Sequence, residues 1–478
     1  MHKRRTKIVA TLGPASSSPQ VIEKLILAGM DVARLNFSHG TAQDHRERTQ
    51  LVRSIAAKHK RRVAIMGDLQ GPKIRIARFK NQQVELQEGK PFTLSNLHPA
   101  DQGDNTIVGI DYPSLVHDCH PGDELLLDDG RVVLKVECVD DHAVYATVTQ
   151  GGVLSNNKGI NRRGGGISAP SLTEKDKADI KTIAELELDY VAISFPRYGH
   201  DITTARELLE AAGSCAWIIA KIERAEAVAD DAALDDLIMA SDGVMVARGD
   251  LGVEVGDARL AGIQKRIILH ARTLNKLVIT ATQMMESMVS SRLPTRAEVS
   301  DVANAVLDYT DAVMLSAETA AGQYPVDAVT AMARICLGAE QEPGTTKSQH
   351  RLGETFHRCD ETIALSAMYA ANHFQGIKAI VSLTESGHTP LIMSRIRSGV
   401  PIYCYTSHTA TEHRVALFRG VYALPFDTNA LEREKIGDTA VRVLVEQGLL
   451  RKGEWVIITK GDTANDGGTN SLRIVCAE

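Results

Sequence analysis

Aromatic side chains are scarce in this sequence, since Phe, Trp and Tyr together make up 4% of its 478 residues. Proteins that bind nucleic acids use aromatic rings to stack on bases and clusters of basic residues to contact phosphates. The basic excess is missing as well, because the formal net charge is −6. We therefore expect no nucleic-acid partner.

Long apolar runs are missing too, and none approaches the roughly 20 residues of a membrane-spanning helix. The basic start, Met1 to Arg5, is followed by Gly13-Pro14 too early for a secretory signal peptide. The seven cysteines form no Cys-x-x-Cys pair, which argues against a zinc site and a disulfide framework. Scattered reduced thiols are typical of the cytoplasm. We expect a soluble cytoplasmic protein without a membrane partner.

What the sequence does contain is a repeated alternation of short β-like runs and helical patterns. Eight such runs begin near residues 7, 32, 63, 190, 216, 243, 277 and 312. This alternation predicts an α/β fold with a parallel sheet. Residues 1–70 and 168–340 together make up about 240 residues, close to the roughly 250 of a (β/α)8 TIM barrel. We predict that these two segments form such a barrel.

Residues 71–167 interrupt the alternation. Between residues 84 and 148, short β-rich runs are separated by turn signals such as Asp128-Asp129-Gly130. They predict an inserted all-β, β-barrel-like lid domain. A linker that starts at Glu342-Pro343-Gly344 precedes residues 345–478, where strands and helices alternate again. We predict a separate open α/β domain there.

Two neighbouring apolar runs end abruptly in charged residues. Residues 217–220 lead into Lys221-Ile222-Glu223, and residues 243–247 lead into Arg248-Gly249-Asp250. Chemistry in barrels gathers at the carboxyl ends of the strands, and alternation puts Lys221 and Glu223 on the same side. An internal salt bridge explains either strand alone. The two strands together favour a site for an anion and a divalent metal, and two carboxylates suit Mg²⁺ or Mn²⁺.

Further polar residues follow the second and third runs. Arg34, Asn36 and Ser38 alternate onto one side and suit a phosphate, although Ser38 also fits a capped helix start. Lys73 and Arg75 follow the third run as loop cations at the junction with the insertion.

Hydroxyl groups follow the last two runs, at Thr282 and Ser316, and suit either an anion or a buried structural role. The sequence has no Walker-type loop and no protein-kinase glycine loop. The cations and carboxylates at the strand ends nevertheless suit the charge neutralisation that phosphoryl transfer requires.

These residues belong to a set of motifs that resembles the pyruvate kinase family from the first strand to the final domain. The motifs are Ala33-Arg-Leu-Asn-Phe-Ser-His-Gly40, Gly67-Asp-Leu-Gln-Gly-Pro-Lys-Ile-Arg75, Ile193-Ser-Phe-Pro196, Ala220-Lys-Ile-Glu223, Met245-Val-Ala-Arg-Gly-Asp-Leu-Gly252, Ala281-Thr-Gln-Met284 and Met314-Leu-Ser-Ala-Glu-Thr319. The resemblance implies transfer of the phosphoryl group of phosphoenolpyruvate to ADP, giving pyruvate and ATP, by a homotetramer.

The resemblance also implies a role for each matched residue. Lys221 would stabilise the transferring phosphoryl group, and Glu223 and Asp250 would hold Mg²⁺ or Mn²⁺. The other implied roles are Arg34 for the substrate phosphate, the amides of Gly249 and Asp250 with the Thr282 hydroxyl for the substrate carboxylate, Asn36, Arg75 and Lys158 for the nucleotide phosphates, and Ser316 for a proton path to the enolate.

The chain departs from the family pattern at the monovalent-cation position. Members that need K⁺ have Glu in place of Lys73 and Thr in place of Leu69, while Asn36, Ser38 and Asp68 match the remaining ligands. We hypothesise that the Lys73 ammonium supplies the charge that K⁺ otherwise provides, so that the enzyme is active without K⁺.

The C-terminal domain resembles the family's regulatory domain. Residues 384–390, Thr-Glu-Ser-Gly-His-Thr-Pro, join a strand to a helix, and we expect Thr389 as N-cap and Pro390 at the first helical position. This helix start suits an anion, although it also fits an ordinary loop. We predict a phosphorylated activator, either a sugar phosphate or a nucleoside monophosphate. Its site would comprise Thr384, Ser386, Gly387, His388 and Thr389.

Two other functions remain as alternatives. One is a metal-dependent barrel enzyme that carries out carbon–carbon chemistry on phosphoenolpyruvate or pyruvate, but the lid cations Arg75 and Lys158 argue against it. The other is a non-catalytic sugar-phosphate sensor, and the intact set of Lys221, Glu223 and Asp250 argues against that.

Overall fold

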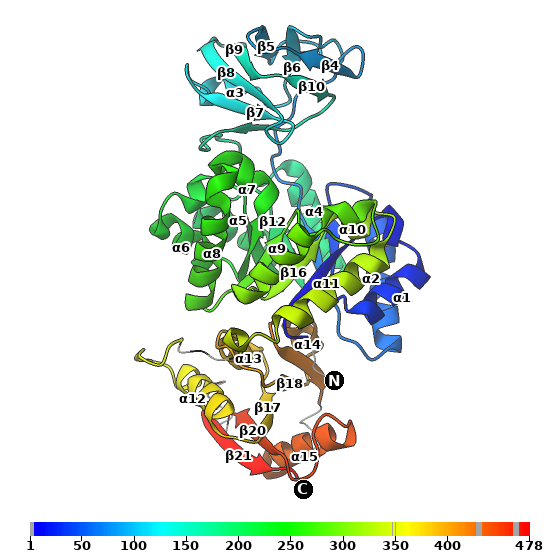
Figure 1. The fold of residues 1–478 in the computed structure, drawn as a ribbon, viewed down its shortest axis with the longest axis vertical. Helices are drawn as coiled ribbons and strands as arrows, with labels where there is room; N and C mark the ends of the chain where they lie inside the picture. The colour runs from blue at the N-terminus through cyan, green and yellow to red at the C-terminus, as the bar shows by residue number, and fades with distance from the viewer. Residues whose placement is uncertain (1–3, 347, 349, 427–432, 462–467) are drawn as a thin grey trace.

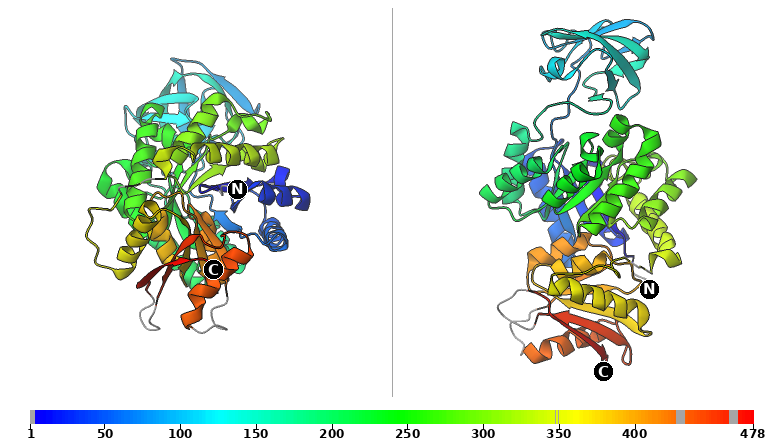
Figure 2. Two further views of the ribbon diagram at one scale, coloured as in Figure 1. Left: turned by 60° about the horizontal axis from the view of Figure 1, so that its bottom comes forward. Right: turned by 90° about the vertical axis from the view of Figure 1, so that its left-hand side faces the viewer.

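The computed structural model describes residues 4–346, 348, 350–426, 433–461 and 468–478. Figures 1 and 2 show three bodies in a row, with a β-rich insertion at one end, a barrel in the middle and an α/β body at the other end. Among the described residues, no helix has both the length and the apolar composition needed to cross a membrane.

Eight parallel strands close into the central barrel in the order β1-β16-β15-β14-β13-β12-β3-β2, which confirms the predicted fold class. Each strand starts within one residue of its predicted position, because continuous buried apolar runs mark such strands clearly. The strands are β1 (Lys7–Leu12), β2 (Val32–Asn36), β3 (Ala64–Asp68), β12 (Tyr190–Ile193), β13 (Trp217–Ile222), β14 (Gly243–Ala247), β15 (Leu277–Ala281) and β16 (Ala312–Leu315).

Helices surround the barrel (Figure 1). They are α1 (Pro19–Ala28), α2 (Ala42–Lys58), α4 (Glu174–Glu185), α5 (Gly199–Ala211), α6 (Asp231–Ala240), α7 (Arg248–Val255), α8 (Asp257–Thr273), α9 (Arg296–Leu307), α10 (Ala317–Ala320) and α11 (Pro325–Ala339), with 3₁₀ turns η1 (Pro14–Ser16), η2 (Glu226–Val228) and η3 (Glu286–Val289). A capping box between Thr295 and Glu298 starts α9.

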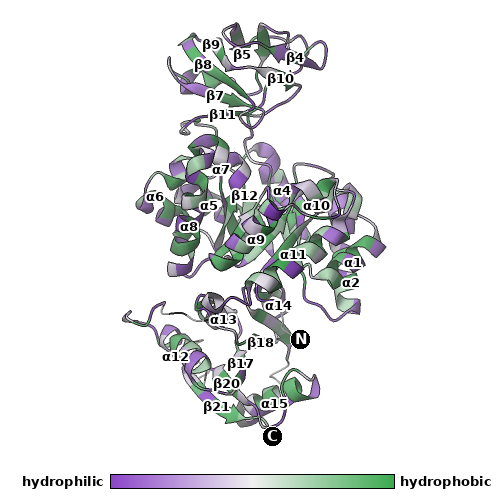
Figure 3. Cartoon of the chain, in the orientation of Figure 1, coloured by the Kyte–Doolittle hydropathy of each residue, from purple (hydrophilic) through white to green (hydrophobic). Residues whose placement is uncertain are grey.

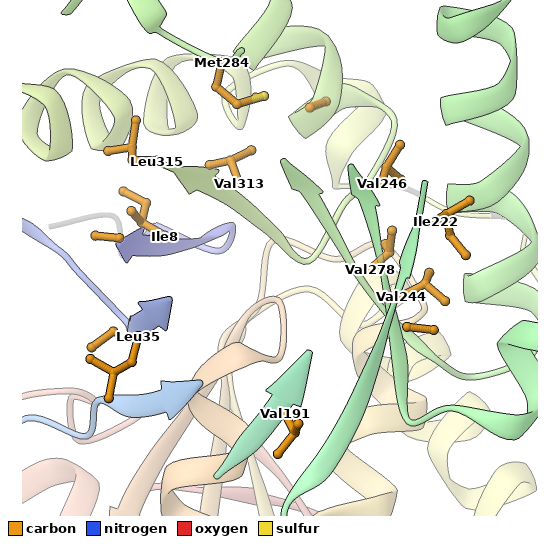
Figure 4. Packing of buried hydrophobic residues seen from close by; sticks show 14 of the residues in the cluster. Ile8, Leu35, Val191, Ile222, Val244, Val246, Val278, Met284, Val313 and Leu315 are labelled. Carbon is orange, nitrogen blue, oxygen red and sulfur yellow. The ribbon is translucent and has the colours of Figure 1, made fainter. Parts of the chain in front are cut away.

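The two faces of each barrel strand pack against different layers. Ile222, Val244 and Val246 belong to the apolar layer between strands and helices (Figure 4). Figure 3 shows hydrophobic residues along the strands and hydrophilic ones scattered over the outer helices. Because side chains alternate along a strand, Lys221 beside Ile222 points into the barrel instead.

The insertion contains a six-stranded sheet in the order β11-β7-β8-β9-β5-β6 and a two-stranded sheet of β10 and β4. Strands β8 and β9 pair antiparallel. A four-residue helix, α3, is an addition to the predicted all-β content. The elements are β4 (Gln83–Leu86), β5 (Pro91–Ser95), β6 (Ile107–Gly109), α3 (Leu115–Asp118), β7 (Glu124–Leu127), β8 (Val132–Val139), β9 (Ala143–Gln150), β10 (Gly152–Ser155) and β11 (Ile160–Arg162).

The C-terminal body has a five-stranded sheet in the order β19-β18-β17-β20-β21. The edge strand β21 runs antiparallel to β20. The elements are η4 (Pro343–Thr345), α12 (Cys359–His373), β17 (Ile377–Leu383), α13 (His388–Ser394), β18 (Ile402–Thr406), α14 (Thr409–Arg414), η5 (Val415–Leu417), β19 (Val421–Pro425), α15 (Arg433–Glu446), β20 (Trp455–Lys460) and β21 (Ser471–Cys476).

The predicted N-cap at Thr389 is wrong. Helix α13 begins at His388, and its N-cap is Gly387, whose φ of 85° lies in the left-handed region that glycine adopts readily. Thr389 is therefore the second residue of the helix, and its hydroxyl lies 2.6 Å from the hydroxyl of Thr469. The glycine lets the chain turn into the helix earlier than the Thr-Pro pair suggests.

The amino ends of the barrel strands lie on the C-terminal body. Val9 and Ile219 of the barrel interior share one apolar cluster with Ile392 and Phe418 of that body. The carboxyl ends, which we call the barrel mouth, therefore face the insertion (Figure 1).

Candidate active site

Lys221 lies inside the barrel mouth among three acceptors. Its Nζ is 2.7 Å from Ser194 Oγ, 3.0 Å from Glu223 Oε1 and 3.3 Å from Asp68 Oδ1. Burial lowers the pKa of Lys221, but Asp68 and Glu223 raise it more, so that the pKa lies above its ordinary value. The ammonium is therefore charged at neutral pH and held in one place.

Glu223 and Asp250 bring two carboxylates to the same mouth. Glu223 is 2% exposed, and its Oε2 accepts the Phe195 N–H at 2.7 Å. Burial raises the pKa of Glu223, and repulsion from Asp250 adds to this effect, while Lys221 lowers the pKa only in part. Two acids close enough to repel each other favour a cation between them.

Lys73 supplies one such cation from the segment that leaves the barrel for the insertion. Its Nζ lies 2.9 Å from Asp250 Oδ1 and 4.0 Å from Asp129 Oδ1 of the insertion. Burial lowers the pKa of Lys73, but Asp250 raises it above the ordinary value, with smaller contributions from Asp129 and Glu223. The sequence did not predict that Lys73 contacts a candidate metal ligand.

Arg34 projects from β2 into the same mouth. Its Nε donates to Asp68 Oδ2 at 2.7 Å, and its Nη1 donates to Thr11 Oγ1 at 2.9 Å. Burial raises the pKa of Asp68, but Arg34 and then Lys221 lower it below its ordinary value. Asp68 therefore remains ionised and serves as counter-ion to two cations.

Among the other residues that the resemblance assigns to a monovalent cation, Asn36 is the strand partner of Asp68 across β2 and β3, and Leu69 directly follows Asp68. Asn36 Oδ1 accepts the Ser38 N–H at 3.1 Å, and the carbonyl oxygen of Leu69 accepts the Ser194 hydroxyl at 2.7 Å. The contacts that we find for the Lys73 ammonium are with carboxylates and do not involve these residues.

A helix starts directly at the end of β14. Arg248, Gly249 and Asp250 form the first turn of α7, and the Gly249 N–H donates to Thr282 Oγ1 at 2.8 Å. Thr282 follows β15 with a φ of 65°, which is unusual for a β-branched residue. Helix-start amides and a hydroxyl thus lie side by side, as an anion requires.

The remaining candidates have partners of their own. Arg75 Nη1 donates to the Asn157 carbonyl oxygen at 2.9 Å, and Lys158 Nζ lies 2.8 Å from Asp128 Oδ1, so both are held by the insertion. Ser316 is the N-cap of α10, and its N–H donates to Glu318 Oε2 at 2.7 Å.

The predicted activator loop also makes contacts of its own. The Gly387 N–H donates to Thr384 Oγ1 at 3.1 Å, and the His388 N–H donates to Ser386 Oγ at 3.3 Å. These turns order the loop between β17 and α13.

Glu254 anchors the returning strand of the insertion to the barrel. This residue of α7 is 1% exposed, and it accepts the Ala225 N–H at 2.8 Å and the Asn161 amide at 3.3 Å. Burial raises the pKa of Glu254 to about 7, although Arg224, at 3.6 Å, lowers it.

The sequence missed two groups that shape this site. Ser194 bonds Lys221, and Arg248 donates to the carbonyl oxygens of three residues in the segment 281–283. Ser194 lies in the Ile193-Ser-Phe-Pro196 motif, but the resemblance gave it no role. Arg248 stands beside Asp250, but its partners are 33 or more residues away.

The chemistry of the donors fits a divalent metal. No group of three or more His, Cys, Asp and Glu side chains suited to a metal occurs within the described ranges. A metal at the mouth would therefore have Glu223 and Asp250 as its protein ligands and take its other ligands from substrate and water. Mg²⁺ binds in this way.

Comparisons with known proteins give the same family along the whole chain. The family models "Pyruvate kinase, barrel domain" and "Pyruvate kinase, alpha/beta domain" match residues 3–329 and 361–475. Pyruvate kinase II of Salmonella typhimurium is 57% identical over 476 residues, which cover 99% of each chain. The pyruvate kinase of Haemophilus influenzae is 55% identical over 458 residues, 96% of each chain. A crystal structure of a pyruvate kinase from Cryptosporidium parvum superimposes with a TM-score of 0.92 at 32% identity, covering 99% of this chain and 96% of that one.

Proposed function

The chain belongs to the pyruvate kinase family of phosphotransferase enzymes, and on that premise we propose that its barrel mouth transfers the phosphoryl group of phosphoenolpyruvate to ADP, giving pyruvate and ATP. The observation that carries the proposal is the Lys221 ammonium, held at 3.0 Å from Glu223 with Asp250 beside that acid.

Lys221 and Arg34 act on the phosphoryl group. In the transition state of phosphoryl transfer, charge is spread over the equatorial oxygens of the moving group. An ammonium that is already oriented by Ser194, Glu223 and Asp68 stabilises this charge without reorganising during the reaction. Arg34, fixed by Asp68, binds the substrate phosphate from the adjacent strand.

The carboxylate of phosphoenolpyruvate lies at the start of α7. The amides of Gly249 and Asp250 and the Thr282 hydroxyl bind it, since Thr282 already lies against Gly249. Glu223 and Asp250 would hold Mg²⁺ or Mn²⁺, which would supply positive charge to neutralise the substrate. Ser316, at the eighth strand, belongs to the proton path to the enolate.

The nucleotide phosphates face Asn36, Arg75 and Lys158. Two of these residues are held by the insertion, so a movement of the insertion towards the mouth would bring them to ADP and exclude water. The monovalent-cation position consists of Asn36, Ser38, Asp68 and Leu69. We propose that Lys73 replaces K⁺ electrostatically, because it already supplies a cation to Asp250.

The C-terminal domain is regulatory in this proposal, and the enzyme is a cytoplasmic homotetramer. A phosphorylated metabolite activates it at the loop formed by Thr384, Ser386, Gly387, His388 and Thr389. Ser386→Glu adds a negative charge where the activator phosphate would lie, so it should abolish activation while leaving basal turnover unchanged. If activation by sugar phosphates and nucleoside monophosphates survives this change, the loop is not the site.

A coupled assay tests the proposed reaction. Purified enzyme is supplied with phosphoenolpyruvate, ADP and Mg²⁺, and pyruvate is measured. Lys221→Met should remove turnover, whereas the matched change Lys265→Met should not, because Lys265 forms an exposed ion pair with Asp308 on the outer helices. Pyruvate formation without ADP, or full activity of Lys221→Met, would contradict the proposal.

A further inference from the structure

Arginines gather at the end of the barrel opposite the mouth, where it meets the C-terminal body. Arg272 lies in the last turn of α8, Arg397 follows α13 and Arg419 precedes β19. Their guanidinium carbons lie 4.4, 5.3 and 4.4 Å from the centre of the Tyr309 ring. Together with Arg351 and Arg395, we call this group the interface arginine cluster.

The carboxylates in this region do not balance the cluster. Asp311 pairs with Arg395 at 2.8 Å and accepts the Arg419 N–H at 3.1 Å. Glu340 binds the Arg5 backbone and lies 3.9 Å from Arg419, while Arg351 pairs with the exposed Glu354 at 3.3 Å.

Two of the arginines keep an uncompensated charge. Within the part of the chain that the structure describes, neither Arg272 nor Arg397 forms an ion pair with a carboxylate. Arg272 instead donates to the carbonyl oxygen of Arg395 at 2.9 Å, and Arg397 to that of Gly344 at 3.0 Å. An excess of about two positive charges therefore remains at the interface, one on the buried Arg272, where an unpaired charge is costly, and one on the partly exposed Arg397.

Several buried nitrogens of the cluster also lack an acceptor. Arg272 and Arg419 are 6% and 2% exposed, yet the Nε atoms of both hydrogen-bond to nothing among the described residues. The same holds for Arg351 Nη1 and for Nε2 of the neighbouring His350. Buried donors without partners are rare in folded proteins, so this group points to a missing anionic acceptor.

The pKa shifts of Arg272 and of the neighbouring His350 agree with an excess of positive charge in the cluster. Burial, together with repulsion from Arg397 and Arg395, lowers the pKa of Arg272 to about 10. Burial and then four surrounding arginines lower the pKa of His350 to about 4, so His350 is neutral at pH 7. After burial, the largest contributions to the lowered pKa of His350 all come from arginines.

We propose that the interface arginine cluster binds the phosphate group of a small phosphate monoester. A dianion matches the two uncompensated charges, and guanidinium groups match phosphate oxygens with paired donors. Arg272 comes from the barrel and Arg397 from the C-terminal body, so the phosphate ties the two together. Helix α8, which ends at Thr273 just past Arg272, begins two residues after α7, the helix that carries Asp250. The site is separate from the loop at residues 384–389 and does not depend on catalysis.

Calorimetric titration of the full-length protein, without phosphoenolpyruvate, ADP or Mg²⁺, tests this site with inorganic phosphate and with glycerol 2-phosphate. We expect both probes to bind, and Arg272→Met and Arg397→Met each to weaken binding by at least about tenfold. Arg414→Met is the matched control, because Arg414 stacks on Trp217 at 4.6 Å in the same interface but lies outside the cluster. It should bind both probes like the unchanged protein.

The melting temperature in phosphate-free buffer shows whether the two variants fold. It should not fall, because each substitution removes a charge that no carboxylate compensates. Binding that survives Arg272→Met and Arg397→Met but disappears in Arg34→Met or Ser386→Glu would assign the phosphate to the mouth or the loop and overturn the proposal. Absence of binding to the unchanged protein would overturn it too. Binding of inorganic phosphate alone would contradict the assignment to a monoester.

Discussion

Arg248 fixes the turn that carries Thr282. Its guanidinium donates to the carbonyl oxygens of Ala281 at 3.2 Å, Thr282 at 2.7 Å and Gln283 at 3.2 Å. Its Nη1 also binds Asp301 at 2.7 Å. Thr282 and Gln283 have φ values of 65° and 52°, and a non-glycine residue in this region costs about 1–3 kcal/mol. Arg248 therefore stabilises a strained turn that keeps the Thr282 hydroxyl against Gly249.

Arg248→Lys preserves the charge but replaces a five-donor planar fork with a compact three-donor ammonium, which cannot keep all the bonds to the three carbonyl oxygens and Asp301. Each charge-assisted hydrogen bond contributes about 1.5–3 kcal/mol, which is comparable to the strain of the turn. Losing one or two of them should let the turn relax and move Thr282 away from the substrate carboxylate. We expect kcat/KM for phosphoenolpyruvate to fall about 10- to 100-fold, equivalent to about 1.4–2.8 kcal/mol.

Steady-state kinetics check this prediction, with phosphoenolpyruvate varied at saturating ADP and Mg²⁺. The loss should occur mainly in KM for phosphoenolpyruvate, while KM for ADP should change little. Arg266→Lys is the control, because Arg266 also donates to a backbone carbonyl, but to that of Val228 and not in the turn that carries Thr282. An unchanged KM for phosphoenolpyruvate in Arg248→Lys would refute the reasoning, as would an equal rise in KM for both substrates.

Three further predictions follow from charged groups of the same site. Lys221→Met should lower kcat at least about 100-fold, because it removes a preorganised charge from the transition state, while calorimetry should still detect phosphoenolpyruvate binding. The unchanged enzyme should turn over in potassium-free buffer, and Lys73→Glu should make turnover depend on added K⁺; strong activation of the unchanged enzyme by K⁺ would rule out the proposed role of Lys73. Glu254 has a folded pKa of about 7, above the ordinary 4.5, so the folded state holds an extra proton between these values and loses stability as pH rises through them. Glu254→Gln should remove up to about 3 kcal/mol of that loss. Urea unfolding at pH 5 and pH 7.5 measures the free energy of unfolding, and an unchanged pH dependence of this free energy would contradict the raised pKa of Glu254.

The barrel could be predicted from the sequence because its strands are buried on both faces. Such strands form short, nearly continuous apolar runs, and the polar residues that end them mark the mouth. Alternation along β13 was enough to place Lys221 beside Glu223. These features depend on the nearest few residues, which the sequence shows directly.

Features that depend on distant parts of the chain could not be predicted in the same way. The pairing of Lys73 with Asp250 joins residues 177 positions apart, and it depends on the path of the chain into the insertion. The edge strand β21 is half-exposed and lacks the apolar run that identified the buried strands. The N-cap of α13 was misplaced because a favourable Thr-Pro pair competed with a glycine, and the glycine's left-handed conformation decided the turn.

The charged groups assigned to ligands already have counter-ions within the protein. Arg34 pairs with Asp68, Lys73 with Asp250 and Lys158 with Asp128. Each pair is at least partly buried, so much of its desolvation cost falls on folding instead of on ligand binding. Binding of a phosphate or a metal then exchanges one ion pair for another, and the net electrostatic gain is smaller than the ligand's charge suggests. Lys221 differs because three acceptors orient its three N–H groups, so it can exchange one of them for a phosphoryl oxygen while the other two hold it in place. The site therefore reserves its strongest preorganised charge for the transition state and leaves the exchangeable pairs to binding.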